Sequence, residues 1–138
     1  MKKIALVLMA VAVFACCGCK HEMKMVEKAA YEYSYAMANY HVDEAAKYAT
    51  EETQNTILKT AKSLLQRVDS SYIKSDTPAK IEIIKVDMVN DSMAVAVYHK
   101  QTPLKDFSGT VDMRKRNGQW YAHVTPRIIP DSLLEQNQ

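Results

Sequence analysis

The chain has 138 residues, of which 48% are hydrophobic and 25% are charged, and its formal net charge is +2. This length suits one ordinary domain with a single core. Two of the 18 basic residues are Lys2 and Lys3, so the rest of the chain carries 16 basic and 16 acidic side chains. Such a balance, with no stripe of lysine and arginine, excludes a nucleic-acid-binding surface.

The first residues have the three-part layout of a secretory signal. Lys2 and Lys3 precede an apolar run over residues 4–15, and small residues follow it. The run is too short to cross a bilayer as a helix. We therefore expect residues 1–18 to be a signal peptide that is removed.

All three cysteines follow this run, at positions 16, 17 and 19. The segment over residues 13–19 resembles the lipobox of bacterial lipoproteins, whose cysteine receives a diacylglyceryl group. We assign the lipid to Cys19, which follows the smallest neighbour, Gly18; Cys16 and Cys17 are the alternatives. Residues 19–22 would then be the lipidated cysteine and a short polar tether. Two or more acyl chains hold a protein firmly on a membrane.

The expected location is the bacterial cell envelope, with the protein anchored by lipid on the periplasmic or surface side of the outer membrane. The alternative is a plain secretory signal whose cysteines form disulfides, but three is an odd number and no further cysteine follows. Cleavage before Cys19 would leave no free thiol. Cysteine catalysis, a disulfide framework and a thiolate zinc site would then all be excluded.

Residues 23–40 show helical periodicity. The apolar positions of one face are Val26, Ala29, Ala30, Tyr33, Met37 and Tyr40. Tyr31 and Tyr35 form a second strip on the other side, one turn apart. Later segments of the chain, or a partner or second subunit, would cover that strip.

Two further helices are predicted before a break. Residues 43–48 open with acidic side chains, which the helix dipole favours in a first turn. Thr50 is a suitable N-cap for a third helix that continues to Val68. Its apolar face comprises Ile57, Leu58, Ala61, Leu64, Leu65 and Val68. Residues 69–78 are rich in turn formers and separate the helical half of the chain from its C-terminal half.

After Pro78 the hydrophobic period becomes that of strands. Residues 80–89 alternate, with a change of phase that predicts a bulge near Ile83 and Ile84. Residues 90–91 form a turn. In the next strand we place Met93, Val95, Val97 and His99 on the inner face, with Ala94, Ala96, Tyr98 and Lys100 on the other.

The last two strands form a hairpin. Phe107, Gly109, Val111 and Met113 are expected to point inward. Asn117-Gly118 is a strong hairpin signal, and the return strand covers residues 119–124. Its inward positions are Trp120, Ala122 and Val124, with Tyr121 and His123 behind. Arg114, Lys115 and Arg116 then lie at a solvated hairpin tip.

Helices followed by an antiparallel meander predict an α+β fold. The N-terminal helices would pack in the concave face of a curved antiparallel sheet, giving a cone-like, cystatin-like domain. We place this single domain at residues 23–130 and a C-terminal tail at residues 131–138.

The order of these elements resembles that of the nuclear-transport-factor-two-like (NTF2-like) superfamily, in particular its small bacterial lipoproteins of unknown function. The likeness spans about residues 23–125. It rests on the segments Val26-Glu27-Lys28, Asp43-Glu44-Ala45-Ala46-Lys47-Tyr48 and Asn117-Gly118-Gln119-Trp120-Tyr121. The chain has Asn39, Tyr40 and His41 where the family usually has glycine and aspartate. The resemblance implies a cone with a pocket at its open end.

Ketosteroid-isomerase-like and polyketide-cyclase-like members of that superfamily use an aspartate or histidine base with a tyrosine donor, but none of their positions transfers here by motif. From strand phase alone, His99 is the candidate base, since imidazole titrates near neutral pH. A histidine satisfied at the surface is the alternative. The candidate ligand-binding residues are Tyr33, Met37, Tyr40, Tyr48, His99 and Trp120. Aromatic and methionine residues at helical spacing are also ordinary core residues.

We expect no metal and no cofactor, because no histidine or carboxylate pair has ligand spacing and no glycine-rich phosphate loop is present. The predicted function is a lipid-anchored binding or interaction module for a small apolar ligand or an envelope protein. The alternative is an isomerase- or cyclase-type enzyme with His99 as base. By family likeness, a homodimer through the sheet is a further expectation.

Overall fold

The computed structural model describes the backbone of residues 2–126 and the side chains of residues 18–126. The predicted tail at 131–138 lies outside the described residues. The helices are α1 (Lys2–Ala38), α2 (Val42–Ala46), α3 (Glu51–Thr53), the π-helical turn η1 (Gln54–Leu58), α4 (Lys59–Leu65) and α5 (Ser70–Ser75). The strands are β1 (Lys80–Asn90), β2 (Met93–Gln101), β3 (Asp106–Arg116) and β4 (Gln119–Ala122).

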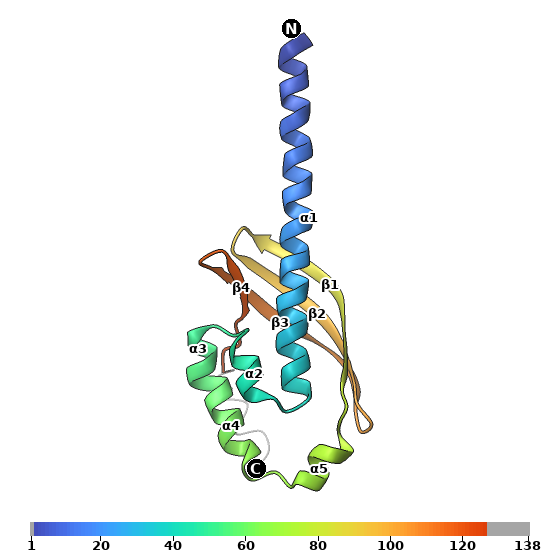
Figure 1. Cartoon of the computed structure of the whole chain (residues 1–138), viewed down its shortest axis with the longest axis vertical. Coiled ribbons are helices and arrows are strands. Elements are labelled where there is room, and N and C mark those ends of the chain that lie inside the picture. Colours follow the sequence, from blue (N-terminus) through green and yellow to red (C-terminus); the bar gives the residue numbers. More distant parts are fainter. Residues whose placement is uncertain (1, 127–138) are drawn as a thin grey trace, which may run out of the picture.

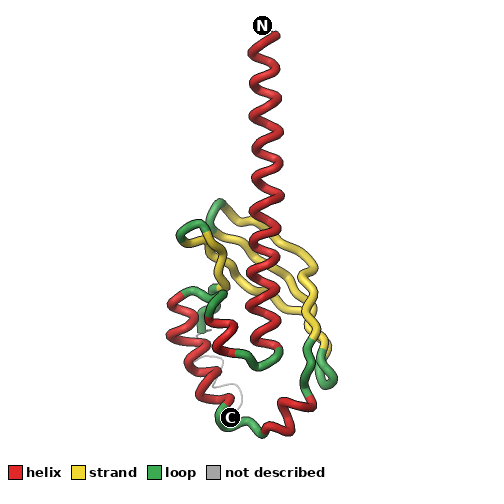
Figure 2. The backbone as a smooth tube through the Cα atoms, in the orientation of Figure 1, coloured by secondary structure: helices red, strands yellow, loops and turns green. Residues whose placement is uncertain are grey.

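The four strands form one antiparallel meander in the order β1-β2-β3-β4. Helix α1 lies across one face of this curved sheet (Figure 1, Figure 2). Helices α2, α3 and α4 lie to one side of the C-terminal half of α1 (Figure 1, Figure 2). The predicted α+β fold is confirmed. None of the helices in the described part of the chain is both long enough and apolar enough to span a membrane.

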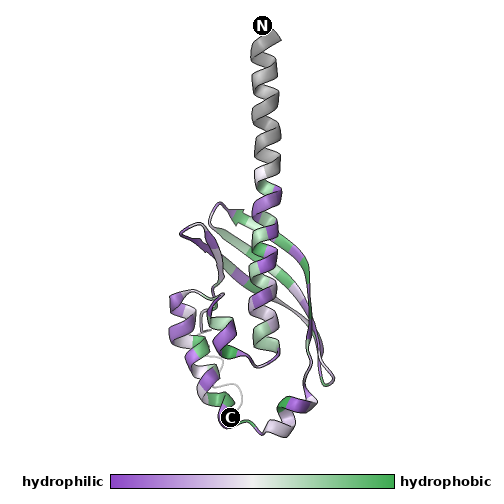
Figure 3. Ribbon diagram, in the orientation of Figure 1, coloured by the Kyte–Doolittle hydropathy of each residue, from purple (hydrophilic) through white to green (hydrophobic). Residues whose placement is uncertain are grey.

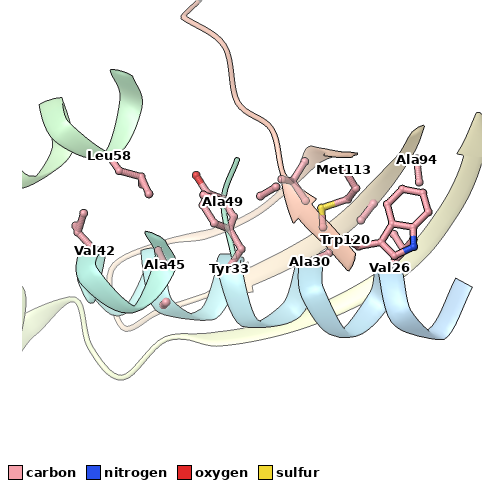
Figure 4. Packing of buried hydrophobic residues seen from close by; sticks show 14 residues of the cluster. Val26, Ala30, Tyr33, Val42, Ala45, Ala49, Leu58, Ala94, Met113 and Trp120 are labelled. Carbon is pink, nitrogen blue, oxygen red and sulfur yellow. The ribbon is translucent and has the colours of Figure 1, made fainter. Parts of the chain in front are cut away.

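The core lies between α1 and the sheet (Figure 4). Val26, Ala30 and Tyr33 of α1 are buried against it, as their helical spacing predicts. Ala94 and Ala96 of β2 are fully buried opposite them. Short side chains on both elements allow the helix backbone to approach the sheet closely.

Helix α1 ends earlier than the periodicity predicts. The His41 N–H donates to the Ala36 carbonyl at 2.8 Å and the Tyr40 N–H to the Met37 carbonyl at 3.1 Å, which is the Schellman pattern. Tyr40 has φ of 64° and therefore lies outside the helix, in a left-handed conformation usually given to glycine. The prediction that Tyr40 extends the helical face is wrong.

The third predicted helix is present, but its apolar face is shorter than expected. Thr50 caps it as predicted, because its Oγ1 accepts the Thr53 N–H at 3.4 Å. The extra residue in the η1 turn keeps Thr53 and Leu58 on the same buried side, although they are five positions apart. Beyond this turn Leu64 is off the buried side and is 56% exposed, and the helix ends at Leu65.

The segment over residues 69–78, which is rich in turn formers, includes the short helix α5. Asp69 caps this helix by accepting the Ser71 N–H at 3.0 Å, and the capped segment continues to Ser75. The turn formers therefore act here partly as helix caps.

The bulge in β1 is confirmed by a register shift between Ile83 and Lys85 against β2. Ile84 occupies the bulge and is exposed, so it does not share the inner face with Val86. The bulge keeps Ile83 and Val86 against the core on either side of it.

The predicted phase of β2 is wrong. Ala94, Ala96, Tyr98 and Lys100 share the inner face, and Met93, Val95, Val97 and His99 share the outer one. The first five residues of β2 are all hydrophobic, so hydropathy alone does not separate the two faces of this strand (Figure 3). Pairing gives the reason: Ala96 stands opposite Val111 and Tyr98 opposite Gly109, and these β3 residues face inward as predicted. Valines on the inner face would also hold α1 away from the sheet.

The Asn117-Gly118 hairpin is confirmed. Asn117 has φ of 52° and Gly118 has φ of 77°, as a two-residue type I′ turn requires. On the return strand Trp120 and Ala122 are buried as predicted. The strand is shorter than the predicted range of residues 119–124, because β4 ends at Ala122.

Candidate ligand cavity

A cavity of about 360 Å³ lies between the C-terminal half of α1 and the inner faces of β2 and β3. This volume is at the small end of the range for ligand pockets. Its lining residues are Tyr33, Ser34, Met37, Ala38, Ile57, Tyr98, Lys100, Phe107, Thr110, Val111 and Val124. Most of them are apolar, and a few polar groups converge among them.

Two tyrosines, Tyr33 and Tyr98, line this cavity. Burial raises the pKa of Tyr33 to about 12, and burial also raises the pKa of Tyr98 above its ordinary value. Both phenols are therefore protonated near neutral pH. They can donate hydrogen bonds to a ligand, but neither can act as a base.

Lys100 is the charged group of the cavity. Burial lowers the pKa of its ammonium from the ordinary value, and its Nζ lies 5.6 Å from the centroid of the Phe107 ring. Within residues 18–126 no carboxylate oxygen lies within ion-pair distance of this ammonium. Lys100 is thus a half-buried cation on an apolar wall that forms no ion pair with the described residues, although the charge of Asp76 acts on it from a longer distance.

Gly109 makes room for the Tyr98 ring. A Cβ atom at position 109 would lie 2.8 Å from the Tyr98 hydroxyl oxygen and 2.9 Å from the ring carbon that carries it. A side chain at position 109 would therefore require the Tyr98 ring to shift. The place of Tyr98 in the cavity therefore depends on a glycine opposite it.

Next to the cavity a buried carboxylate ties three segments together. Asp76 is fully buried and accepts hydrogen bonds from Tyr40 Oη and Thr102 Oγ1, both at 2.5 Å, and from Lys105 Nζ at 3.4 Å. The hydrogen bonds from Thr102 and Tyr40 lower the pKa of Asp76. This cluster joins the residues after α1, the end of α5 and the loop between β2 and β3.

The structure brings only part of the predicted ligand set together. Tyr33 and Met37 line the cavity, whereas the Tyr40 hydroxyl is held by Asp76. Trp120 is a core residue whose Nε1 donates to Glu22 Oε2 at 2.8 Å. Tyr48 packs against the core cluster away from the lining, and its carbonyl accepts the Ala122 N–H at 2.7 Å.

His99 lies outside the cavity. Its ring is on the outer face of the sheet, where Nε2 is 2.5 Å from Asp106 Oδ1. The expectation that it continues an inward series fails with the phase of β2. Four residues that line the cavity were not among the candidates from the sequence: Ser34, Tyr98, Lys100 and Phe107. Gly109 is the signal that could have indicated the two β2 residues, because a glycine on an inner face leaves space for a large side chain on the neighbouring strand.

Among the residues that the structure describes, no three histidine, cysteine, aspartate or glutamate side chains form a group that could hold a metal ion. None of those residue types lines the cavity between α1 and the sheet.

Comparison with solved structures shows an NTF2-like fold. A proposed NTF2-like transpeptidase from Campylobacter jejuni is similar with a TM-score of 0.54 and 11% identity, over 72% of this chain and 97% of that chain. An NTF-2 like protein of unknown function from Shewanella oneidensis has a TM-score of 0.52 and 13% identity, over 72% and 95%. A ketosteroid isomerase-like protein from Erwinia carotovora has a TM-score of 0.50 and 13% identity, over 73% and 90%.

No family model matches the chain, and no curated protein matches it. The expected NTF2-like fold is confirmed by the structural similarity. At these identities the similarity establishes the fold alone.

Proposed function

We propose that this chain is an exported lipoprotein whose cavity binds a small amphipathic ligand with an apolar body and an anionic group. The observation that carries the ligand class is Lys100. A half-buried ammonium that forms no ion pair within residues 18–126, on a wall that is otherwise mostly apolar, is complementary to a carboxylate or a similar anion attached to a hydrocarbon.

Hydroxyl groups in the cavity support the same ligand class. Tyr33 and Tyr98 are protonated donors, so they can add hydrogen bonds to an anionic oxygen next to Lys100. Met37, Phe107 and Val111 supply apolar surface for the rest of the molecule. The volume of about 360 Å³ favours a small ligand over a complete phospholipid.

The enzyme alternative has less support. An isomerase or cyclase of the predicted type needs a base in the cavity, and His99 faces the other side of the sheet. With the carboxylates also outside the lining, binding is the function that the described residues favour.

The ligand proposal is tested by titrating the protein with decanoate and, separately, with uncharged decanol. Replacing Lys100 by methionine should weaken decanoate binding by roughly 10- to 100-fold, which corresponds to the free energy of a hydrogen bond to a charged group. The same change should leave decanol binding unchanged. Lys85→Met is the matched control, since Lys85 is an exposed β1 lysine that pairs with Asp87 outside this cavity. Equal decanoate affinity in wild type and Lys100→Met would exclude the proposed role of the ammonium.

Anchoring is tested by growing cells with an alkyne analogue of palmitate and detecting the label on the purified protein. The Cys19→Ala variant should lose the label completely, because the thiol that forms the thioether is gone. Cys16→Ala and Cys17→Ala are matched controls and should keep it. If Cys19→Ala keeps the label and Cys17→Ala loses it, the lipid is on Cys17 and the assignment to Cys19 is wrong.

A further inference from the structure

Glu22 fixes the start of the domain only three residues after Cys19. Its Oε1 pairs with Lys115 Nζ at 2.8 Å, and its Oε2 accepts from Trp120 Nε1 at 2.8 Å. The hydrogen bond from Lys115, followed by that from Trp120, lowers the pKa of Glu22. Because Trp120 is buried, this carboxylate is held on the folded body. Contacts of the domain thus begin inside the segment that the sequence suggested as a tether.

This position leaves very little free chain between a lipid on Cys19 and the domain. The three steps from Cys19 to Glu22 cover about 4.5 Å as a helix and at most about 11 Å fully extended. Helix α1 runs without interruption through both residues. The end of the domain at Glu22 would therefore lie next to the membrane surface even if these residues unwind.

The two hairpin turns lie at this same end, where α1 leaves the sheet (Figure 1). The β1–β2 turn contains Asp91, and the β3–β4 turn contains Asn117 and Gly118. The loop between β2 and β3 and helix α5 lie at the opposite end (Figure 1). We call these the Glu22 end and the Leu104 end of the domain, after a residue of each.

The charged group of the cavity belongs to the Leu104 end. Lys100 and Phe107 flank the β2–β3 loop, in which Leu104 is 54% exposed. Along α1, Met37 of the cavity lining is 15 residues beyond Glu22, which corresponds to about 22 Å. The ammonium of Lys100 is thus separated from the Glu22 end by much of the length of the domain.

We propose that the anchored protein stands with its Glu22 end on the bilayer and its Leu104 end in water, so that the cavity takes an amphiphile from the aqueous phase and does not draw a lipid directly from its own membrane. This inference rests on the proposed lipidation of Cys19. It adds the orientation of the domain and the source of the ligand.

The orientation is tested with two single-cysteine variants of the lipidated protein, Asp91→Cys at the Glu22 end and Leu104→Cys at the other. Each carries the same fluorophore and is reconstituted into phosphatidylcholine vesicles containing a lipid with a quencher on its headgroup. We expect quenching of the label at position 91 to be at least fivefold stronger than at position 104. A water-soluble maleimide should also modify Leu104→Cys as fast on vesicles as in detergent.

A lengthened tether is the matched control. Inserting ten glycine and serine residues between Lys20 and His21 adds a coil of about 17 Å, which should bring the two quenching values close together. Equal quenching at both positions with the natural tether, or stronger quenching at position 104, would overturn the orientation.

Flotation of the vesicles separates this result from a failure of the anchor. If the labelled proteins float with the vesicles but the quenching pattern is wrong, only the orientation fails. If they do not float, the lipidation and the orientation both fail. The decanoate titration of the Cys19→Ala protein tests the ligand class independently of either.

Discussion

Replacing Asp76 by alanine should lower the free energy of unfolding by about 3 kcal/mol, or the melting temperature by about 15 °C. The change leaves the Thr102 and Tyr40 hydroxyls without their acceptor, and Thr102 is buried. Lys105 is partly exposed and can return to water, so it adds less to the loss. Thermal unfolding followed by the fluorescence of Trp120, the single tryptophan, measures the effect.

Asp91→Ala is the matched control, because Asp91 is an exposed residue of the β1–β2 turn, and it should change stability by less than about 0.5 kcal/mol. A loss at Asp76 no larger than this control would show that the three segments are held together by other contacts.

The Asp76 effect should depend on pH. Hydrogen bonds from Thr102 and Tyr40 lower the pKa of this carboxyl in the folded state. A carboxyl with a lowered pKa stabilises the fold above its unfolded pKa of about 3.9, and this contribution is lost as the pH falls through the folded pKa. The difference between wild type and Asp76→Ala should therefore be full at pH 7 and shrink below about pH 4. A difference that stays constant down to pH 2 would contradict an ionised Asp76.

Replacing Trp120 by alanine should cost about 3–5 kcal/mol, the usual loss for a large aromatic side chain in a core. Trp120 is buried between β4 and the start of the packed part of α1 (Figure 4), and its indole N–H also holds Glu22. Urea unfolding followed by far-ultraviolet circular dichroism measures the loss, because the variant has no tryptophan left to report it.

Trp120→Phe removes the hydrogen bond while keeping part of the packing. It keeps a buried aromatic ring but removes the N–H donor together with the smaller ring of the indole, so it should cost about 1–2 kcal/mol, less than the alanine variant. The pKa of Glu22 should then rise toward its ordinary value, because one of the hydrogen bonds that lower it is lost. The rise should be partial, because the stronger effect, the hydrogen bond from Lys115, remains. Equal losses for the phenylalanine and alanine variants would mean that the hydrogen bond, and not the burial of the ring, dominates.

Local patterns predicted the elements with strong signals of their own. The α1 face, the Thr50 cap, the β1 bulge and the Asn117-Gly118 turn each depend on a few neighbouring residues, and the structure has all of them. The phase of β2 was wrong because both of its faces are apolar in sequence. Pairing with β3 and the close approach of α1 determine which face of β2 points inward. The sequence of β2 alone contains neither of these contacts.

The candidate site was missed for the same reason. With β2 in the wrong phase, His99 was placed inside and Tyr98 and Lys100 outside, so the cation of the cavity was overlooked. Tyr40 was misplaced because helical spacing cannot show that a non-glycine residue adopts a left-handed conformation. The hydroxyl of Tyr40 bonds to Asp76, 36 positions away, and this distant contact helps to hold that backbone shape.

The absent side chain at Gly109 has a consequence for the shape of the cavity. A Cβ atom there would overlap the Tyr98 hydroxyl, so any larger residue would force this ring, which lines the cavity, to move. Under the proposed function, one methyl group added at position 109 would therefore change which hydrocarbon lengths fit the cavity. Under the same proposal, a substitution at position 109 would alter the preferred chain length while Lys100 keeps its role toward the anionic group.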